Sequence, residues 1–147
     1  MAKDARPVQI LLAEDSEPDV RLTREALKDS KFRNELFVVR DGVEALQFLK
    51  NEAPFEDAPW PDVLLLDLNM PRKDGREVLL EIKNDDALKS LPVVILTTSH
   101  EEEDVVRSYK LHANCYVRKP LDVESFFDVV RSIENFWFQI VALPTKP

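Results

Sequence analysis

The sequence predicts an α/β fold built around a parallel sheet. Short apolar runs alternate five times with longer segments of helical character, which is the pattern of successive βα units. Four of these runs are almost continuous in Val, Ile and Leu, as expected for strands that are covered on both faces. A chain of 147 residues can bury a substantial core, and we expect one domain over 1–147, with its core at about 8–140 and a short C-terminal tail.

The predicted strands and helices follow one another along the chain. The apolar runs that predict strands cover 8–13, 36–39, 63–66, 93–96 and 115–117. The predicted helices cover 18–30, 42–51, 75–84, 100–111 and 122–140. Three helix starts carry a side-chain acceptor followed three residues later by an acidic residue: Ser16 with Asp19, Asp41 with Glu44, and Ser99 with Glu102.

The charge balance excludes several classes of function. A formal net charge of −8 disfavours direct binding to nucleic acid, which needs a basic surface for the phosphate backbone. No apolar run approaches the roughly 20 residues that cross a bilayer, and the N-terminus lacks a signal-peptide core. We therefore expect a soluble, cytoplasmic protein that contacts neither nucleic acid nor membrane directly.

Polar side chains gather where the predicted strands end. Ligands of open parallel sheets bind at the carboxyl ends of the strands, beside the point where the strand order reverses. The residues at these ends are Glu14 and Asp15 after the first strand, Asp67 after the third, Thr97 and Thr98 after the fourth, and Arg118 and Lys119 after the fifth. Three carboxylates, a pair of hydroxyls and a cation are therefore expected at one edge of the sheet.

Three neighbouring carboxylates need a cation that balances their charge. At neutral pH they repel one another strongly at low effective dielectric, and a divalent ion offsets that repulsion. Magnesium favours oxygen ligands in octahedral geometry, and these acids fit it better than a softer metal. The histidines, His100 and His112, fall on or beside the fourth predicted helix, where we interpret them as surface residues and not zinc ligands.

Four motifs in order resemble the receiver domains of two-component response regulators. They are Leu-Ala-Glu-Asp-Ser at 12–16, Leu-Leu-Leu-Asp-Leu-Asn-Met-Pro-Arg-Lys-Asp-Gly at 64–75, Val-Val-Ile-Leu-Thr-Thr at 93–98 and Tyr-Val-Arg-Lys-Pro at 116–120. The resemblance covers about 8–138. It implies a flavodoxin-like, doubly wound sheet of five parallel strands in the order 2-1-3-4-5, with five helices.

The resemblance also implies a role for each matching acidic residue. It makes Asp67 the phosphoacceptor and places Glu14, Asp15, Asp67 and the backbone carbonyl of Asn69 around Mg²⁺. Many receivers have Asp where this chain has Glu14, and the exchange is common in the family. We therefore expect metal binding to be retained.

Three further residues take switch and pairing roles by the same resemblance. Lys119 would pair with the phosphoryl group, and the hydroxyl of Thr97 would donate to a phosphoryl oxygen. Tyr116 would be the aromatic side chain that changes rotamer when Thr97 moves. Phosphorylation adds charge and acceptor oxygens, and their pairing with Thr97 and Lys119 can bias a loop between two states.

Other segments resemble the small stand-alone regulators that partner phytochrome-type sensor histidine kinases. They are Phe-Trp-Phe-Gln-Ile-Val-Ala-Leu-Pro at 136–144, Asp-Gly-Arg-Glu-Val-Leu at 74–79 and Thr-Thr-Ser-His at 97–100. The resemblance implies such a kinase as partner, and a homodimer formed through the fourth and fifth helices and the fifth strand. Self-phosphorylation and slow self-hydrolysis would be the protein's only chemistry.

Two other functions use a similar sheet. A small magnesium-dependent phosphatase of the haloacid-dehalogenase type also has an aspartyl nucleophile, but it needs a second Asp two residues later, where this chain has Asn69. A flavodoxin-like flavin carrier needs a loop rich in Ser, Thr and Gly after the first strand. The sequence there is Glu-Asp-Ser-Glu-Pro-Asp, at 14–19, which would repel a phosphate.

Overall fold

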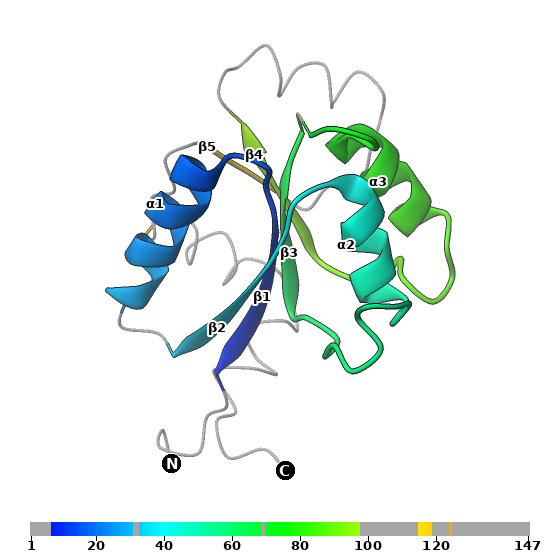
Figure 1. The fold of residues 1–147 in the computed structure, drawn as a ribbon, viewed down its shortest axis with the longest axis horizontal. Helices are drawn as coiled ribbons and strands as arrows, with labels where there is room; N and C mark the ends of the chain where they lie inside the picture. Colours follow the sequence, from blue (N-terminus) through cyan, green and yellow to red (C-terminus); the bar gives the residue numbers. More distant parts are fainter. Residues whose placement is uncertain (1–6, 31–32, 69, 98–114, 119–123, 125–147) are drawn as a thin grey trace.

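A parallel sheet organises the chain (Figure 1). The computed structural model describes residues 7–30, 33–68, 70–97, 115–118 and residue 124. The strands lie in the order β2-β1-β3-β4-β5, and each neighbouring pair is parallel. The strands are β1 (Val8–Ala13), β2 (Asn34–Val39), β3 (Val63–Asp67), β4 (Val93–Thr97) and β5 (Cys115–Arg118). The helices are α1 (Glu17–Lys28), α2 (Gly42–Leu49) and α3 (Gly75–Lys83).

The predicted parallel α/β sheet is confirmed. The helix predicted over 100–111, and all but residue 124 of that predicted over 122–140, lie outside the described residues.

The element ends differ from the predicted ones by a few residues. β2 starts two residues earlier than predicted, because parallel pairing with β1 sets Asn34 against Val8. α1 begins after its N-cap Ser16, whose side chain accepts the N–H of Asp19. α2 ends at Leu49, and Asn51 beyond it adopts a φ of 55°, which a continuing helix does not allow. None of the helices in the described ranges is long and apolar enough to cross a membrane.

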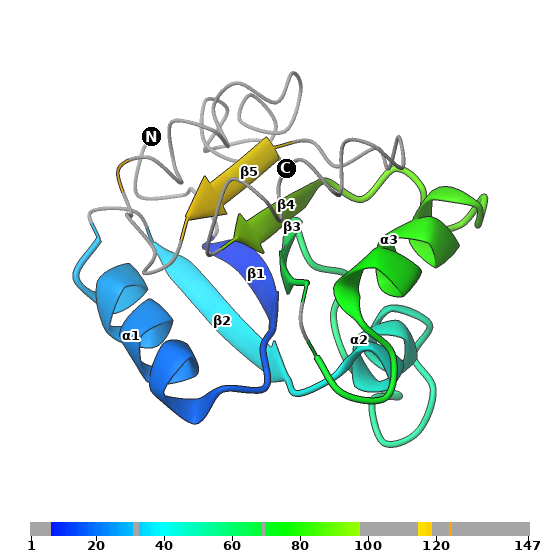
Figure 2. The same ribbon diagram turned by 90° about the horizontal axis from the view of Figure 1, so that it is seen from above.

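The continuous apolar strands bury residues on both faces of the sheet. In β3, Leu64 and Leu66 join the cluster that includes α2 and α3, whereas Val63 and Leu65 join the cluster that includes α1. Figure 2 shows α1 on one face and α2 with α3 on the other. The side-chain period of two residues therefore divides one apolar run between two cores. This packing fixes the sheet and holds its strand ends in place.

The only two glycines of the chain are the first residues of α2 and α3. Neither has a positive φ, so backbone freedom is not what these positions require. A Cβ on Gly42 would lie 2.2 Å from the carbonyl oxygen of Lys73, and one on Gly75 would lie 2.5 Å from that of Asp67. Both glycines therefore permit close backbone approach around the segment that follows β3.

Candidate functional site

The carboxyl ends of β1 and β3 lie side by side where the strand order reverses. The chain continues from β1 to β2 on one side, and β3 lies on the other side of β1. The register pairs Ala13 with Leu66, so Glu14 and Asp67 follow at the same level of neighbouring strands. This reversal point is where open α/β sheets bind their ligands.

Three carboxylates meet at this point. One carboxylate oxygen from each of Glu14, Asp15 and Asp67 lies within 4.8 Å of the others. Glu14 is 1% exposed and Asp67 is 3% exposed, whereas Asp15 is exposed to solvent. The structure thus brings together the three acids that the sequence assigned to the strand ends.

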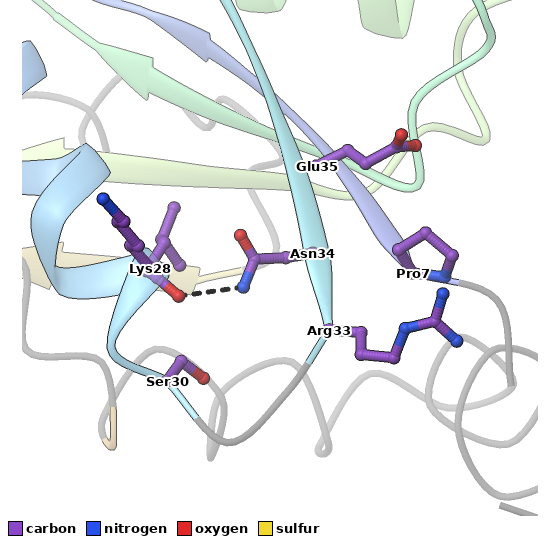
Figure 3. A pocket seen from close by; sticks show the side chains of 7 residues that line it. Pro7, Lys28, Ser30, Arg33, Asn34 and Glu35 are labelled. Carbon is purple, nitrogen blue, oxygen red and sulfur yellow. Dashed lines mark hydrogen bonds between the residues drawn. The ribbon is translucent and has the colours of Figure 1, made fainter. Parts of the chain in front are cut away.

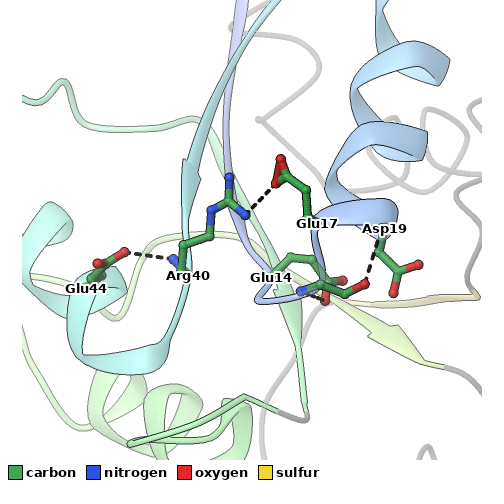
Figure 4. Close-up of polar contacts among 6 residues, drawn as sticks. Glu14, Glu17, Asp19, Arg40 and Glu44 are labelled. Carbon is green, nitrogen blue, oxygen red and sulfur yellow. Dashed lines mark hydrogen bonds and ion pairs between the residues drawn. The ribbon is translucent and has the colours of Figure 1, made fainter.

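Glu14 shows how the cluster is held. Its Oε2 accepts the N–H of Ser16 at 3.2 Å (Figure 4). Its Oε1 is buried as well. Buried carboxylate oxygens are costly unless a donor or a cation compensates them. Three hard oxygen donors at this spacing fit a hard divalent cation.

The other residues assigned by resemblance are less fully described. Asp67 pairs with Leu96 in the β3–β4 register, so the backbone of Thr97 follows directly beside the acidic cluster. Tyr116 lies in β5, where its backbone pairs with that of Ile95. The side chains of Thr97 and Tyr116 fall outside what the structure describes, as do the whole of Asn69 and Lys119.

An ion pair close to the acidic edge links three elements. Nη1 of Arg40, just after β2, contacts Oε1 of Glu17 in α1 at 2.7 Å (Figure 4). The backbone N–H of Arg40 donates to Oε1 of Glu44 in α2 at 2.8 Å. The hydrogen bond from Arg40, with its charge, lowers the pKa of Glu17 below the usual value for Glu. Sequence patterns missed this pair because its partners are 23 residues apart.

Two contacts of the segment after β3 were also missed. Asp74 and Glu77 form a reciprocal capping box at the start of α3. The acidic pair at this spacing was the local signal that could have found it. Arg72 binds Asp41 at the start of α2, and no local pattern indicates that contact.

A hollow of about 500 Å³ lies at the opposite end of β1 and β2 (Figure 3). Its lining includes Pro7, directly before β1, and Asn34, the first residue of β2. Inside it, the side chain of Asn34 donates to the carbonyl of Leu27 at 3.0 Å. The hollow therefore belongs to the amino ends of the strands and is separate from the acidic cluster.

Comparison with known proteins identifies the family of the chain. Residues 10–131 match the response regulator receiver domain family, and the chain belongs to that family. Response regulator Rcp1 of Synechocystis sp. is 51% identical over 138 residues, which are 94% of each chain. Rcp1 has also been solved in a Mn²⁺-bound form, with a TM-score of 0.71 over 92% of this chain and 97% of that one.

Two further solved structures are similar over nearly the whole of both chains. The phosphorylated cyanobacterial phytochrome response regulator RcpA is 48% identical, with a TM-score of 0.72 over 90% of this chain and 95% of that one. The bacteriophytochrome response regulator AtBRR is 42% identical, with a TM-score of 0.84 over 90% and 96%. The chain is therefore a two-component response regulator related to the phytochrome response regulators.

Proposed function

We propose that this protein accepts a phosphoryl group on Asp67 from a sensor histidine kinase and thereby controls the binding of a partner. The observation that carries the proposal is the set of three carboxylates within 4.8 Å at the reversal point of the sheet. Asp67 belongs to a buried strand and is itself 3% exposed, so its carboxylate is held in a fixed position. Fixed placement is what a weak carboxylate nucleophile needs most.

The proposed transfer needs little covalent chemistry from the protein. A carboxylate oxygen of Asp67 forms a bond to phosphorus while the bond from phosphorus to the imidazole nitrogen of the donor breaks. The electron pair stays on that nitrogen, which takes up a proton. The protein's part is in-line placement and compensation of charge on the transferred oxygens.

We assign Mg²⁺ to Glu14, Asp15 and Asp67, with the backbone carbonyl of Asn69 as the further ligand implied by the family. A bound divalent cation supplies neutralisation of charge on the phosphoryl oxygens. The donor set and the Mn²⁺-bound form of Rcp1 support a divalent ion. The preference of Mg²⁺ for carboxylate and water ligands makes it our choice.

The switch residues complete the proposal. Thr97 would donate its hydroxyl to a phosphoryl oxygen, Lys119 would pair with the phosphoryl group, and Tyr116 would follow Thr97 by changing rotamer. The backbone of Thr97 at the end of β4, beside Asp67, supports the first assignment. The result would be a changed surface around β5 and the helices predicted over 100–111 and 122–140.

The partner in this proposal is a phytochrome-type sensor kinase. Support comes from the phytochrome response regulators RcpA and AtBRR, which resemble this chain over 90% of its length. We further propose that 1–147 forms one receiver domain in which five helices accompany the five-stranded sheet. We also propose a homodimer formed through the same switch surface, and a cytoplasmic location, where a kinase finds ATP.

Labelling with a radioactive phosphoryl donor tests the proposal. We expect acetyl phosphate or a phosphorylated phytochrome-type kinase to label the wild-type protein, and Asp67→Asn to reduce labelling to background. The label should be released by hydroxylamine, as an acyl phosphate is and a serine phosphate is not. Asp57→Asn, the same change at an exposed loop residue, is the matched control and should label normally. Undiminished labelling of Asp67→Asn would refute the assignment.

Metal removal tests the cation separately. EDTA should stop labelling and added MgCl₂ should restore it, whereas transfer without metal would contradict the proposed Mg²⁺ site. Turnover of p-nitrophenyl phosphate would instead favour the phosphatase alternative. Dimer formation is measured by sedimentation at micromolar concentration, where a strict monomer in both phosphorylation states would contradict the dimer.

A further inference from the structure

A salt bridge joins the segment after β3 to the start of α2. Nε and Nη2 of Arg72 lie 2.8 and 2.6 Å from Oδ2 of Asp41. The other oxygen of Asp41, Oδ1, accepts the backbone N–H of Glu44 at 2.9 Å as the N-cap of α2. The side chain of Asp41 is 10% exposed and that of Arg72 is 56% exposed, and both oxygens of Asp41 accept hydrogen bonds.

The backbone beside this salt bridge is locked as well. The N–H of Gly42 donates to the carbonyl oxygen of Lys73 at 3.0 Å, and the missing Cβ of Gly42 is what allows that approach. Nζ of Lys73 pairs with Glu81 in α3. The segment 70–74 is therefore attached to both helices on its face of the sheet.

Arg72 holds an unusual backbone conformation in this segment. Its φ is 66°, in the left-handed region that non-glycine residues rarely adopt. Such a conformation persists where surrounding contacts over-determine it, and such residues cluster at functional sites. The contacts here are those of the Arg72 side chain, so a glycine would satisfy the backbone but lose the salt bridge.

The same segment returns to Asp67. The N–H of Gly75 donates to the carbonyl oxygen of Leu68 at 2.9 Å, and Gly75 packs directly against the carbonyl oxygen of Asp67. Between these points, the side chain of Met70 is 8% exposed and belongs to the core. A shift of the segment at Arg72 would thus be transmitted to the backbone that carries the Asp67 carboxylate.

We infer that Asp41 and Arg72 are positioning residues for the acidic cluster: their salt bridge fixes the segment after β3 and, through it, the Asp67 carboxylate. The inference rests on the proposed function, since it assigns the salt bridge a task in metal binding and phosphoryl acceptance. Neither residue belongs to the cluster of candidate ligands.

The direction in which the affinity for Mg²⁺ changes separates a positioning role of Arg72 from a simple effect of its charge. Loss of the positive charge of Arg72 makes the neighbourhood more negative, and charge alone would then strengthen binding of a divalent cation. A displaced Asp67 carboxylate would weaken that binding. Arg72→Met keeps most of the aliphatic stem and removes the charge. In this variant the two effects would therefore change the affinity for Mg²⁺ in opposite directions.

Titration of the folded, full-length protein with MgCl₂ by calorimetry measures the effect. Loss of a group that hydrogen-bonds a metal ligand directly commonly costs tenfold or more in metal affinity. Arg72 acts on Asp67 only through the backbone, so we expect Arg72→Met to raise the Kd for Mg²⁺ by less, about threefold to tenfold. Arg76→Met removes the same charge from the first turn of α3, where its nearest acid lies 3.7 Å away, and should leave the Kd unchanged or lower.

Two more variants test the salt bridge itself. Asp41→Asn keeps an N-cap acceptor but loses the ionic partner, and it should weaken Mg²⁺ binding to a similar extent. Because the two residues act as one unit, the double variant should be no weaker than the worse single one. Arg72→Lys, which keeps the charge with a single donor group, should fall between Arg72→Met and the wild type.

Urea unfolding and Arg72→Gly distinguish positioning from a merely structural role. Arg72→Gly relieves the positive φ, so it should be at least as stable as Arg72→Met and yet bind Mg²⁺ as weakly. An unchanged Kd in folded Arg72→Met, or a Kd that follows stability across the series, would overturn the inference. Failure of the wild type itself to bind Mg²⁺ would instead overturn the proposed function, and the inference with it.

Discussion

Gly75 offers the sharpest test of how tightly the segment after β3 packs on the acidic site. A Cβ at this position would meet three backbone atoms, at 2.5 Å from the Asp67 oxygen, 2.8 Å from Leu68 Cα and 3.2 Å from the Asp67 carbonyl carbon. Ordinary van der Waals contact begins near 3.4 Å, so Gly75→Ala must move backbone by about 1 Å.

The expected cost follows from two opposing effects. Gly75 has no positive φ, so without neighbours an alanine would stabilise the fold by about 0.4–1 kcal/mol through the unfolded state. Overpacking against rigid backbone costs about 1–3 kcal/mol. The cost of overpacking is the larger of the two effects, so we expect Gly75→Ala to lower the free energy of unfolding by about 1–2 kcal/mol.

Urea denaturation followed by circular dichroism measures this loss. With a slope of about 2 kcal/mol per molar urea, the midpoint should fall by about 0.5–1 M. The control is Arg76→Ala, which introduces alanine at the next position, and its free energy of unfolding should stay within about 0.5 kcal/mol of the wild type. A midpoint for Gly75→Ala that equals or exceeds that of the wild type would show that the backbone contact is not tight, and the reasoning would fail.

Three further predictions concern other parts of the fold. Asp74→Ala removes the capping box of α3 and should destabilise the protein by about 1 kcal/mol in urea, with Asp74→Asn restoring most of it. Leu65→Ala empties a fully buried position and should cost about 2–5 kcal/mol, whereas Leu22→Ala, at a residue 54% exposed, should cost less than about 0.5. Arg40→Met should raise the pKa of Glu17 toward its ordinary value of 4.5 in an NMR titration. Because the folded pKa is the lowered one, any stability from this pair is present above the unfolded pKa and disappears as the pH falls through the folded one.

Each of these predictions has its own contrary result. Equal midpoints for Asp74→Ala and the wild type would show that the capping box contributes nothing. Equal losses for Leu65→Ala and Leu22→Ala would contradict the assignment of buried and exposed faces. An unchanged titration of Glu17 in Arg40→Met would show that other groups set its pKa.

Local patterns predicted a large share of the fold. The runs at 8–13, 63–66 and 93–96 lie in strands because continuous Val, Ile and Leu suit a strand covered on both faces. The caps Ser16 and Asp41 also stand where the sequence predicted them. Both kinds of signal depend on residues within a few positions of one another, and a sequence displays them directly.

Element ends and partners were less accessible to such patterns. β2 begins at Asn34 because of its pairing with β1, although Asn and Glu are poor strand formers. The strand order came from the family resemblance, since apolar runs do not state which strand lies beside which. The salt bridge between Asp41 and Arg72 joins residues 31 positions apart and has no local signature.

By itself, the sequence determined the alternation of strands and helices and the acids that follow the first and third strands, because burial and chain order act through neighbouring residues. Only the tertiary structure decided that Glu14, Asp15 and Asp67 meet within 4.8 Å. It also explains why Gly42 and Gly75 are glycines, because the carbonyl oxygens of Lys73 and Asp67 lie where a Cβ would be. Such approaches depend on how distant segments pack, and close packing in three dimensions has no counterpart in local spacing.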